Sequence, residues 1–246
     1  MIIEIDGKAC TCSPGEYLLN IASRNGFSIP TLCHHDGLPG QGCCRVCIVE
    51  VSLRDRKDIV TACIYPVEQE CSVFTDSDRV KRQRGMILAL LRASAPESEE
   101  ISRLCKMYDA PLYERLTQKA NEKCILCGLC VSACETLGAS AISSVNRGVE
   151  KTVSTPYDEP AADCIGCASC AAVCPTGAIS VEENNSSRAI WNRKFTLQLC
   201  RHCGKPVGTL DELAFAARKT GVAQTTLCEE CRRKAIADEM ITAYER

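Results

Sequence analysis

The sequence predicts an α+β protein built from a row of small domains that are held together partly by metal. Three observations support this class. Cysteine accounts for 21 of the 246 residues and gathers in C-x2-C clusters. Residues 1–75 contain alternating and β-branched runs typical of strands, whereas residues 76–120 carry apolar residues at helical spacing. Small cores of this kind gain folding free energy from bound metal.

The composition of the chain disfavours several classes of function. A formal charge of -2 and an aromatic content of 4% argue against nucleic-acid binding, which usually needs a basic surface and stacking residues. The N-terminus MIIEIDGK has acidic residues and no apolar segment of a signal peptide, and the apolar run Met86–Leu91 is far too short to span a membrane. We therefore expect a soluble cytoplasmic protein without a membrane span, whose thiols bind metal instead of forming disulfides.

Residues 1–76 predict a β-rich domain. Ile3 and Ile5 alternate with acidic residues, and Asp6-Gly7 is a hairpin turn signal. Apolar residues from Tyr17 to Ala22 recur at helical spacing before the stop signal Asn25-Gly26. Further strands are expected in the β-branched runs Val46–Ser52, Ile59–Tyr65 and Cys71–Thr75. This ββαβ order indicates a β-grasp ferredoxin.

Four cysteines of this domain are candidate ligands of a 2Fe-2S cluster. They are Cys33, Cys44, Cys47 and Cys63, in the spacing C-x10-C-x2-C-x15-C. The loop between the first two is rich in Gly and Pro, which lets backbone amides approach the sulfurs and help set the reduction potential. Cys43 stands beside Cys44 and could substitute for it.

The stretch Cys124–Cys174 repeats the spacing C-x2-C-x2-C-x3-C twice. In that pattern three thiolates of each run hold one 4Fe-4S cube and the fourth ligates the other cube. The first cube therefore takes Cys124, Cys127, Cys130 and Cys174, and the second takes Cys134, Cys164, Cys167 and Cys170. Two zinc knuckles are the alternative to two cubes, but they would leave the fourth cysteine of each run without a ligand role. Residues 121–183 thus predict a two-cluster ferredoxin domain with turns and short strands in its long spacer, residues 135–163.

Residues 77–120 predict a helical connector. A helix from Asp76 to Ala93 is expected, capped by Asp76 or Ser77 and burying Val80, Ile87, Leu88 and Leu91. Its basic residues are Arg79, Lys81, Arg82 and Arg84. A solvated helix face is the favoured interpretation of that run, and a docking patch is the alternative. Residues 97–120 continue at helical spacing.

The tail contains two further C-x2-C pairs. Cys200, Cys203, Cys228 and Cys231 predict a closed four-thiolate zinc site in a domain over residues 190–246, and a further iron-sulfur cluster is the rival. An amphipathic helix is expected over Leu210–Ala217, and His202 is interpreted as a neighbour of the site. The remaining cysteines are expected to be buried apolar thiols: Cys10, Cys12, Cys43, Cys71 and Cys105.

The segment P-T-L-C-H-H-D-G-L-P-G-Q-G-C-C-R-V-C-I-V-E-V, followed by V-T-A-C-I-Y-P-V, resembles the N-terminal 2Fe-2S domain of the peripheral-arm iron-sulfur subunit of respiratory complex I. It is equally similar to the corresponding subunits of NAD-reducing and electron-bifurcating hydrogenases and of NAD-linked formate dehydrogenases. The resemblance covers residues 1–182 and favours Cys44 over Cys43, since Cys44 restores the family's C-R-V-C spacing. In that family a His/Cys element for a further cube follows the helix. Here Ser94-Ala95-Pro96 stands there with Cys105 alone behind it, so the resemblance implies that this cube is absent.

No G-x-G-x-x-G after a strand, P-loop or Ser/His/Asp set is present in the sequence, so no nucleotide or catalytic site is expected. The resemblance implies a non-catalytic electron-transfer subunit of a flavin-dependent, NAD(P)-linked oxidoreductase of the hydrogenase, formate dehydrogenase or transhydrogenase type, electron bifurcation included. Its expected partners are a flavoprotein subunit that binds NAD(P), a further redox subunit and a soluble ferredoxin. A free multicluster ferredoxin carrier is the alternative, and a nucleic-acid-binding redox sensor is disfavoured by the charge.

Overall fold

A computed structural model describes residues 1–54, 56–116, 120–223 and 226–244. The chain forms two compact units, Met1–Ser132 with Val173–Ala178, and Ala133–Ala172 with Ile179–Arg246. The division into four domains made from the sequence stays a prediction. Residues 117–119 of its connector, and 224–225 and 245–246 of its C-terminal domain, lie outside the described residues.

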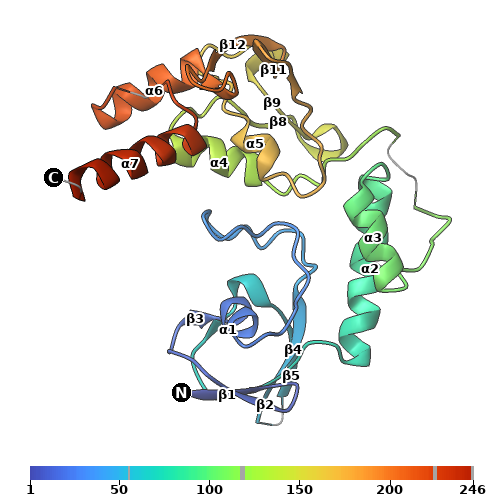
Figure 1. Cartoon of the computed structure of the whole chain (residues 1–246). Coiled ribbons are helices and arrows are strands. Elements are labelled where there is room, and N and C mark those ends of the chain that lie inside the picture. The colour runs from blue at the N-terminus through green and yellow to red at the C-terminus, as the bar shows by residue number, and fades with distance from the viewer. Residues whose placement is uncertain (55, 117–119, 224–225, 245–246) are drawn as a thin grey trace. The chain divides into compact units, whose positions relative to one another are not determined.

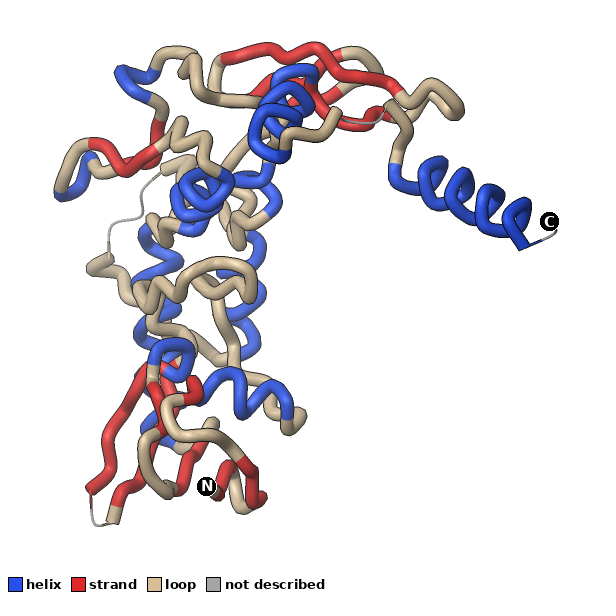
Figure 2. The backbone as a smooth tube through the Cα atoms, turned by 90° about the vertical axis from the view of Figure 1, so that its left-hand side faces the viewer, coloured by secondary structure: helices blue, strands red, loops and turns tan. Residues whose placement is uncertain are grey.

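The first unit begins with the predicted β-grasp sheet, whose strands surround the N-terminus in Figure 2. Its strand order is β2-β1-β7-β4-β5. The first and last strands of the domain, β1 and β7, are parallel neighbours, and the other pairs are antiparallel. The strands are β1 (Ile2–Ile5), β2 (Lys8–Thr11), β4 (Ile48–Leu53), β5 (Arg56–Thr61) and β7 (Ser72–Phe74).

Helix α1 (Leu18–Arg24) packs on this sheet and ends before Asn25-Gly26, as predicted (Figure 1). Ile3, Ile5, Leu18 and Ile21 are fully buried in the core between them. The short pair β3 (Glu16–Tyr17) and β6 (Pro66–Val67) lies next to the helix. The run Ile59–Tyr65 is not one strand, because β5 ends at Thr61 and Ala62–Ile64 form a turn of 3₁₀ helix. Cys63 lies on that turn.

Helices α2 (Asp78–Ser94) and α3 (Glu99–Met107) run side by side after the sheet (Figure 1). Ser77 and Ser98 accept hydrogen bonds from the amides of Val80 and Ile101, so each is an N-cap. Within the predicted helical connector over 97–120, α3 ends at Met107 and residues 108–116 form turns and loop, while 117–119 lie outside the described residues. Asp109 is in the left-handed region (φ 46°) and Pro111 lacks an amide donor, so neither suits a continuing helix.

The predicted basic face of α2 is wrong at one position. Arg84 is 1% exposed and is neither a solvated side chain nor part of a docking patch. Its guanidinium donates to the carbonyl oxygens of Val46, Ile48 and Thr75 and stacks over the ring of Tyr108. A buried cation is tolerated there because its donors are satisfied.

The second unit contains the long spacer and the C-terminal part of the chain. The spacer forms the hairpin β8 (Ser143–Val145) and β9 (Thr152–Ser154), with 3₁₀ turns at Gly148–Glu150 and Pro156–Asp158. Two helices carry part of the cysteine runs: α4 (Leu129–Leu137) contains Cys130 and Cys134, and α5 (Ser169–Ala172) contains Cys170. Helix α4 begins in the first unit and ends in the second.

A four-stranded antiparallel sheet follows, in the order β10-β11-β12-β13. Its strands are β10 (Glu182–Glu183), β11 (Ser187–Ile190), β12 (Arg193–Leu199) and β13 (Pro206–Thr209). Helix α6 (Leu210–Thr220) starts from a capping box of Thr209 and Glu212, and α7 (Glu229–Tyr244) projects from the rest of its unit in Figure 2. None of the described helices is long and apolar enough to cross a lipid bilayer.

Candidate metal centres

The predicted 2Fe-2S ligands lie together in the first unit. All four, Cys33, Cys44, Cys47 and Cys63, are buried. Hydrogen bonds from the thiols of Cys43, Cys44 and Cys63 hold the pKa of Cys33 far below its usual range, and the thiol of Cys63 lowers the pKa of Cys47 to about 7. The amide of Cys44 also donates to Cys33 Sγ at 3.4 Å. The four thiols therefore lie close enough together to be candidate ligands of one small cluster.

Cys43 differs from the four predicted ligands. It is exposed, so the expectation of a buried apolar thiol is wrong for this residue, and Cys71 is only half-buried. Cys10, Cys12 and Cys105 are buried as expected. The Cys43 thiol donates to the carbonyl oxygen of Cys127 at 3.4 Å and also lies close enough to Cys33 to lower the pKa of that thiol. It therefore bridges two ligand loops without being needed to complete the set of four.

The four cysteines predicted for the first cube also meet in the first unit. Burial raises the pKa of Cys127 to about 11 and that of Cys130 to about 12, and both thiols feel the charges of Cys124 and Cys174. Backbone amides point at the sulfurs, since Leu126 donates to Cys124 Sγ and Ala178 to Cys174 Sγ, each at 3.3 Å. Amides aimed at cysteine sulfur are the usual surroundings of an iron-sulfur cube, and the site fits one.

These first two sites are neighbours. Cys127 lies close enough to Cys33 for its thiol to feel that charge, and both belong to one apolar cluster with Cys44, Leu32 and Leu129. Ala95 and Cys105 lie in the same cluster. The thiol of Cys105 donates to the carbonyl oxygen of Leu88 at 3.5 Å. Ala95 and Cys105, the segment where the sequence implies that the extra His/Cys cube is missing, therefore contribute to this apolar packing.

The second predicted cube has its own pocket in the second unit. Cys134, Cys164, Cys167 and Cys170 all line it, and its walls are apolar. The wall residues include Leu137, Ala141, Ile142, Ile165, Ile190 and Trp191. The amide of Ala141 donates to Cys134 Sγ at 3.2 Å, and the indole N–H of Trp191 donates to Cys170 Sγ at 3.4 Å. An apolar pocket with four thiols and N–H donors to sulfur fits a 4Fe-4S cube.

The C-terminal sheet holds the 161–166 loop, which carries Cys164 and leads directly into Cys167. Arg193 donates to the carbonyl oxygens of Ala161, Ala162 and Cys164, and forms an ion pair with Asp211. Arg188 donates to the carbonyl oxygen of Gly166, and Thr209 donates to that of Ile165. Side chains of β11, β12 and β13 therefore hold the 161–166 loop in place through hydrogen bonds to its carbonyl oxygens.

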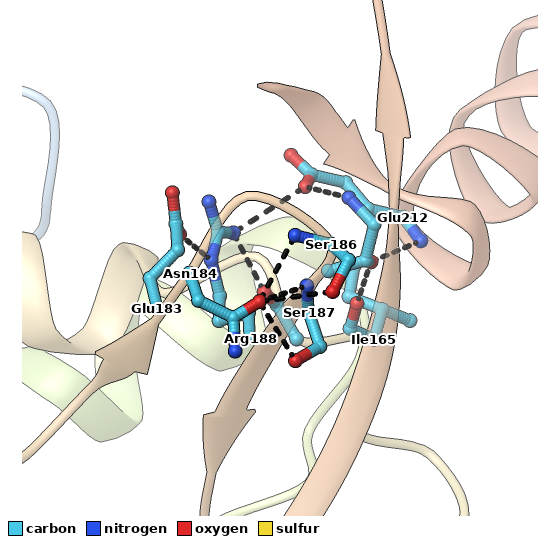
Figure 3. A network of polar contacts seen from close by, with 9 residues as sticks. Ile165, Glu183, Asn184, Ser186, Ser187, Arg188 and Glu212 are labelled. Carbon is cyan, nitrogen blue, oxygen red and sulfur yellow. Dashed lines mark hydrogen bonds and ion pairs between the residues drawn. The ribbon is translucent and has the colours of Figure 1, made fainter. Parts of the chain in front are cut away.

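Figure 3 shows how Arg188 is itself positioned. It forms ion pairs with Glu183 and Glu212, and burial raises the pKa of the Glu212 carboxyl while the amide of Thr209 opposes that shift. The carboxamide oxygen of Asn184 accepts bonds from Ser186 and Ser187, which closes the turn before β11 (Figure 3). The polar stretch 183–187 forms the structured turn that joins β10 to β11.

The tail cysteines form the tightest group. Sulfur atoms of Cys200, Cys203, Cys228 and Cys231 all lie within 4.8 Å of one another, and those of Cys203 and Cys228 are 3.6 Å apart. Backbone amides of Cys228 and Cys203 lower the pKa of Cys200 to about 6. His202 Nδ1 is 3.6 Å from Cys231 Sγ, beside the group. Four thiols this close suit a single tetrahedral ion, whose sulfurs stand about 3.8 Å apart when the bonds are about 2.3 Å long.

Sequence reasoning missed Arg84, Arg188, Arg193 and Trp191, which support these sites. The only feature of the sequence that could have drawn attention to Trp191 is that the chain contains a single tryptophan. The supporting role of the three arginines has no sequence signal, because their partners are backbone carbonyl oxygens that lie far away along the chain.

Comparison with known proteins finds both kinds of iron-sulfur domain that the sequence predicts. Residues 1–78 match the 2Fe-2S iron-sulfur cluster binding domain family, and residues 123–178 and 163–209 match the 4Fe-4S dicluster domain family. The chain is 31% identical to the NADPH-Fe(3+) oxidoreductase subunit alpha of Geobacter sulfurreducens over 82% of this chain and 26% of that protein. It is 27% identical to a subunit of the NADH-quinone oxidoreductase of Rhizobium meliloti, over 92% of this chain and 30% of the relative.

A third relative is the NADP-reducing hydrogenase subunit HndD of Solidesulfovibrio fructosivorans, 30% identical over 74% of this chain and 36% of the relative. The chain thus spans about a quarter to a third of the length of the curated relatives it matches. Among solved structures, a chain of an NAD+-reducing [NiFe]-hydrogenase in the H2-reduced state aligns with a TM-score of 0.60 and 25% identity. That alignment covers 72% of this chain and 85% of the hydrogenase chain.

Proposed function

We propose that this chain, which carries a 2Fe-2S cluster binding domain followed by a 4Fe-4S dicluster domain, is an electron-transfer subunit of a multi-subunit, flavin-dependent NAD(P)-linked oxidoreductase. Bound iron-sulfur clusters supply one-electron transfer, and the chain's own residues hold them, exclude water and adjust their potentials. The hydrogenase, formate dehydrogenase and transhydrogenase types remain the candidates, electron bifurcation included.

The observation that carries the proposal is the proximity of the first two sites. Cys33 belongs to the predicted 2Fe-2S ligands and Cys127 to those of the first cube, yet the two thiols lie close together, with Cys43 in contact with both residues. Cys130 and Cys134, predicted to ligate different cubes, stand one turn apart on α4. Two neighbouring one-electron sites, followed along the chain by the predicted ligands of a third, suit a subunit that conducts electrons.

The ligand sets remain part of the proposal. Cys33, Cys44, Cys47 and Cys63 would hold the 2Fe-2S cluster, and the two sets of four in Cys124–Cys174 the cubes. We assign the tail cysteines to one zinc ion. Their spread of at most 4.8 Å supports this choice, since a cube binds each thiolate at a separate iron and keeps the sulfurs further apart. Among the described residues no predicted cube set forms so tight a group.

The proposed partners are a flavoprotein subunit that exchanges hydride with NAD(P) and a second redox subunit or ferredoxin. Each relative named above is a subunit by name, which supports a place in a complex. The test is size-exclusion of a native extract prepared without oxygen, followed by flavin assay of the fractions that contain this chain. We expect co-elution with flavin and at least one further subunit.

A free multicluster ferredoxin is the competing function. It requires that the native chain elute as a monomer with all its iron and no flavin, and that result would defeat the proposal. The same chain produced alone in a heterologous host is the control, because it gives the elution volume of the monomer.

A further inference from the structure

Trp191 occupies an unusual backbone position next to the second cube site. Strands β11 and β12 are joined by a two-residue turn, Trp191-Asn192, because Ile190 pairs directly with Arg193. Both turn residues have positive φ, 52° and 57°, as a type I′ turn demands. Asn suits this conformation, whereas an aromatic residue is disfavoured there. Something outside the turn therefore has to stabilise Trp191 in place.

That stabilising contact is with a predicted cluster ligand. The indole Nε1 donates to Cys170 Sγ at 3.4 Å, and the ring lines the pocket together with Ile165 and Ile190. The indole is a donor only, so it can satisfy a thiolate and cannot compete with it for the metal.

The hairpin cannot easily move away from the pocket. On one side of the turn Arg188 is bonded to Gly166, and on the other Arg193 is bonded to the carbonyl oxygens of Ala161, Ala162 and Cys164. The ring of Phe195, over which Arg193 stacks, packs against Gly166. The ion pairs of Arg188 seen in Figure 3 fix the first of these anchors. Trp191 is therefore held against the pocket by the same loop that carries Cys164.

We propose that Trp191 raises the reduction potential of the second cube through its hydrogen bond to Cys170 and shields that cube from water. Reduction adds negative charge to the cluster and its thiolates, so an N–H donor to sulfur stabilises the reduced state more than the oxidised state. The C-terminal sheet thereby controls a centre whose ligands all come from outside it. This inference rests on the assignment of a cube to Cys134, Cys164, Cys167 and Cys170.

The test compares the wild-type chain with Trp191→Phe, which keeps an aromatic ring and removes the N–H group. Redox titration followed by electron paramagnetic resonance gives the midpoint potential of each centre. We expect the second cube alone to shift to lower potential in the variant. A hydrogen bond to a charged group would change the ratio of reduced to oxidised cube about tenfold at a fixed potential, which is about 59 mV for one electron. The other two centres of the same sample are the internal reference.

Isotope labelling gives a second measurement that does not depend on a variant. Since the chain has one tryptophan, ¹⁵N-indole labelling marks this contact alone. A ¹⁵N coupling in the pulsed resonance spectrum of the reduced second cube is expected. Trp191→Ala, which also removes the ring, should lose the iron of that cube to oxygen faster than Trp191→Phe does.

The possible failures are distinguishable. If iron analysis of the wild-type chain accounts for fewer than two cubes, or if Cys167→Ser removes no cube signal, the ligand assignment fails and the inference falls with it. If both cubes are present but Trp191→Phe leaves every potential unchanged, or the labelled indole shows no coupling, the role of Trp191 is refuted while the proposed function stands. Should Trp191→Phe fail to retain the cube, the labelling result on the wild-type chain decides alone.

Discussion

Arg84 links helix α2 to the strand that follows the 2Fe-2S ligand loop. Its guanidinium bonds to the carbonyl oxygens of Val46 and Ile48, the two residues on either side of Cys47. Burial lowers the pKa of the guanidinium, while Tyr108 and Asp76 favour its charged form. An arginine here cross-links helix, strand and ligand loop through one side chain.

We predict that Arg84→Met destabilises the first unit by about 3 kcal/mol, because buried carbonyl oxygens lose their donors. Denaturant titration followed by the visible circular dichroism of the 2Fe-2S centre measures the change. Arg82→Met is the matched control, since Arg82 lies on the same helix but is exposed, and it should change stability by about 0.5 kcal/mol or less. Equal effects of the two variants would contradict the structural role of Arg84.

Two features of the structure favour glycine at position 166. Its φ is +68°, and a Cβ atom would lie 2.6 Å from the ring of Phe195. Gly177 has a similar φ of +60° but open space around it. The two glycines therefore separate backbone strain from a steric clash.

We predict that Gly166→Ala loses the second cube, about four iron atoms per chain, whereas Gly177→Ala keeps all its iron and costs only about 1 kcal/mol of strain. Iron analysis after anaerobic purification is the measurement. A Gly166→Ala chain with full iron content would show that the 161–166 loop can move away from Phe195 without opening the site.

Among the elements, those with local sequence signals were predicted well. The turn Asp6-Gly7, the cap Ser77 and the helix from Leu210 have signals within a few residues, and each is found near its expected place. The cysteine spacings likewise grouped the four tail thiols, which lie together, and the four cysteines that line one pocket of the second unit. What the sequence did not reveal depends on contacts between distant segments: the burial of Arg84, and the packing of β11 and β12 on the 161–166 loop. Neither periodicity nor turn chemistry encodes a bond to a remote carbonyl.

The two C-x2-C knuckles of the tail connect β12 and β13 to the start of α7, so one ion would join three elements. We predict that the purified chain contains about ten iron atoms and one zinc, and that Cys228→Ser removes the zinc while the iron stays. Metal analysis by mass spectrometry checks both parts. Cys71→Ser, a half-buried cysteine that no proposed site uses, should leave both metals unchanged. About fourteen iron atoms without zinc would instead establish a further cluster in the tail.

At the scale of the whole molecule, the 2Fe-2S site and the first cube site belong to one compact unit and share one apolar cluster. Their separation is therefore set by packing around Cys33, Cys44 and Cys127, and does not depend on how the second unit is placed. Two paramagnetic centres held at such a fixed short separation interact when both are reduced. The second cube's ligands come from the other unit, so a variant that lacks the second cube is the control for one that lacks the first.

We predict that the fully reduced chain shows a 2Fe-2S resonance broadened by the first cube. Cys174→Ser, which removes a ligand of that cube, should narrow the 2Fe-2S signal, while Cys167→Ser, which removes a ligand of the second cube, should leave it unchanged. Electron paramagnetic resonance at several microwave powers and temperatures makes the comparison, with the singly reduced chain as the reference for an isolated 2Fe-2S centre. If the two variants behave alike, the first cube is not the near neighbour of the 2Fe-2S centre. Electrons would then have to leave that centre through a partner subunit instead of along this chain.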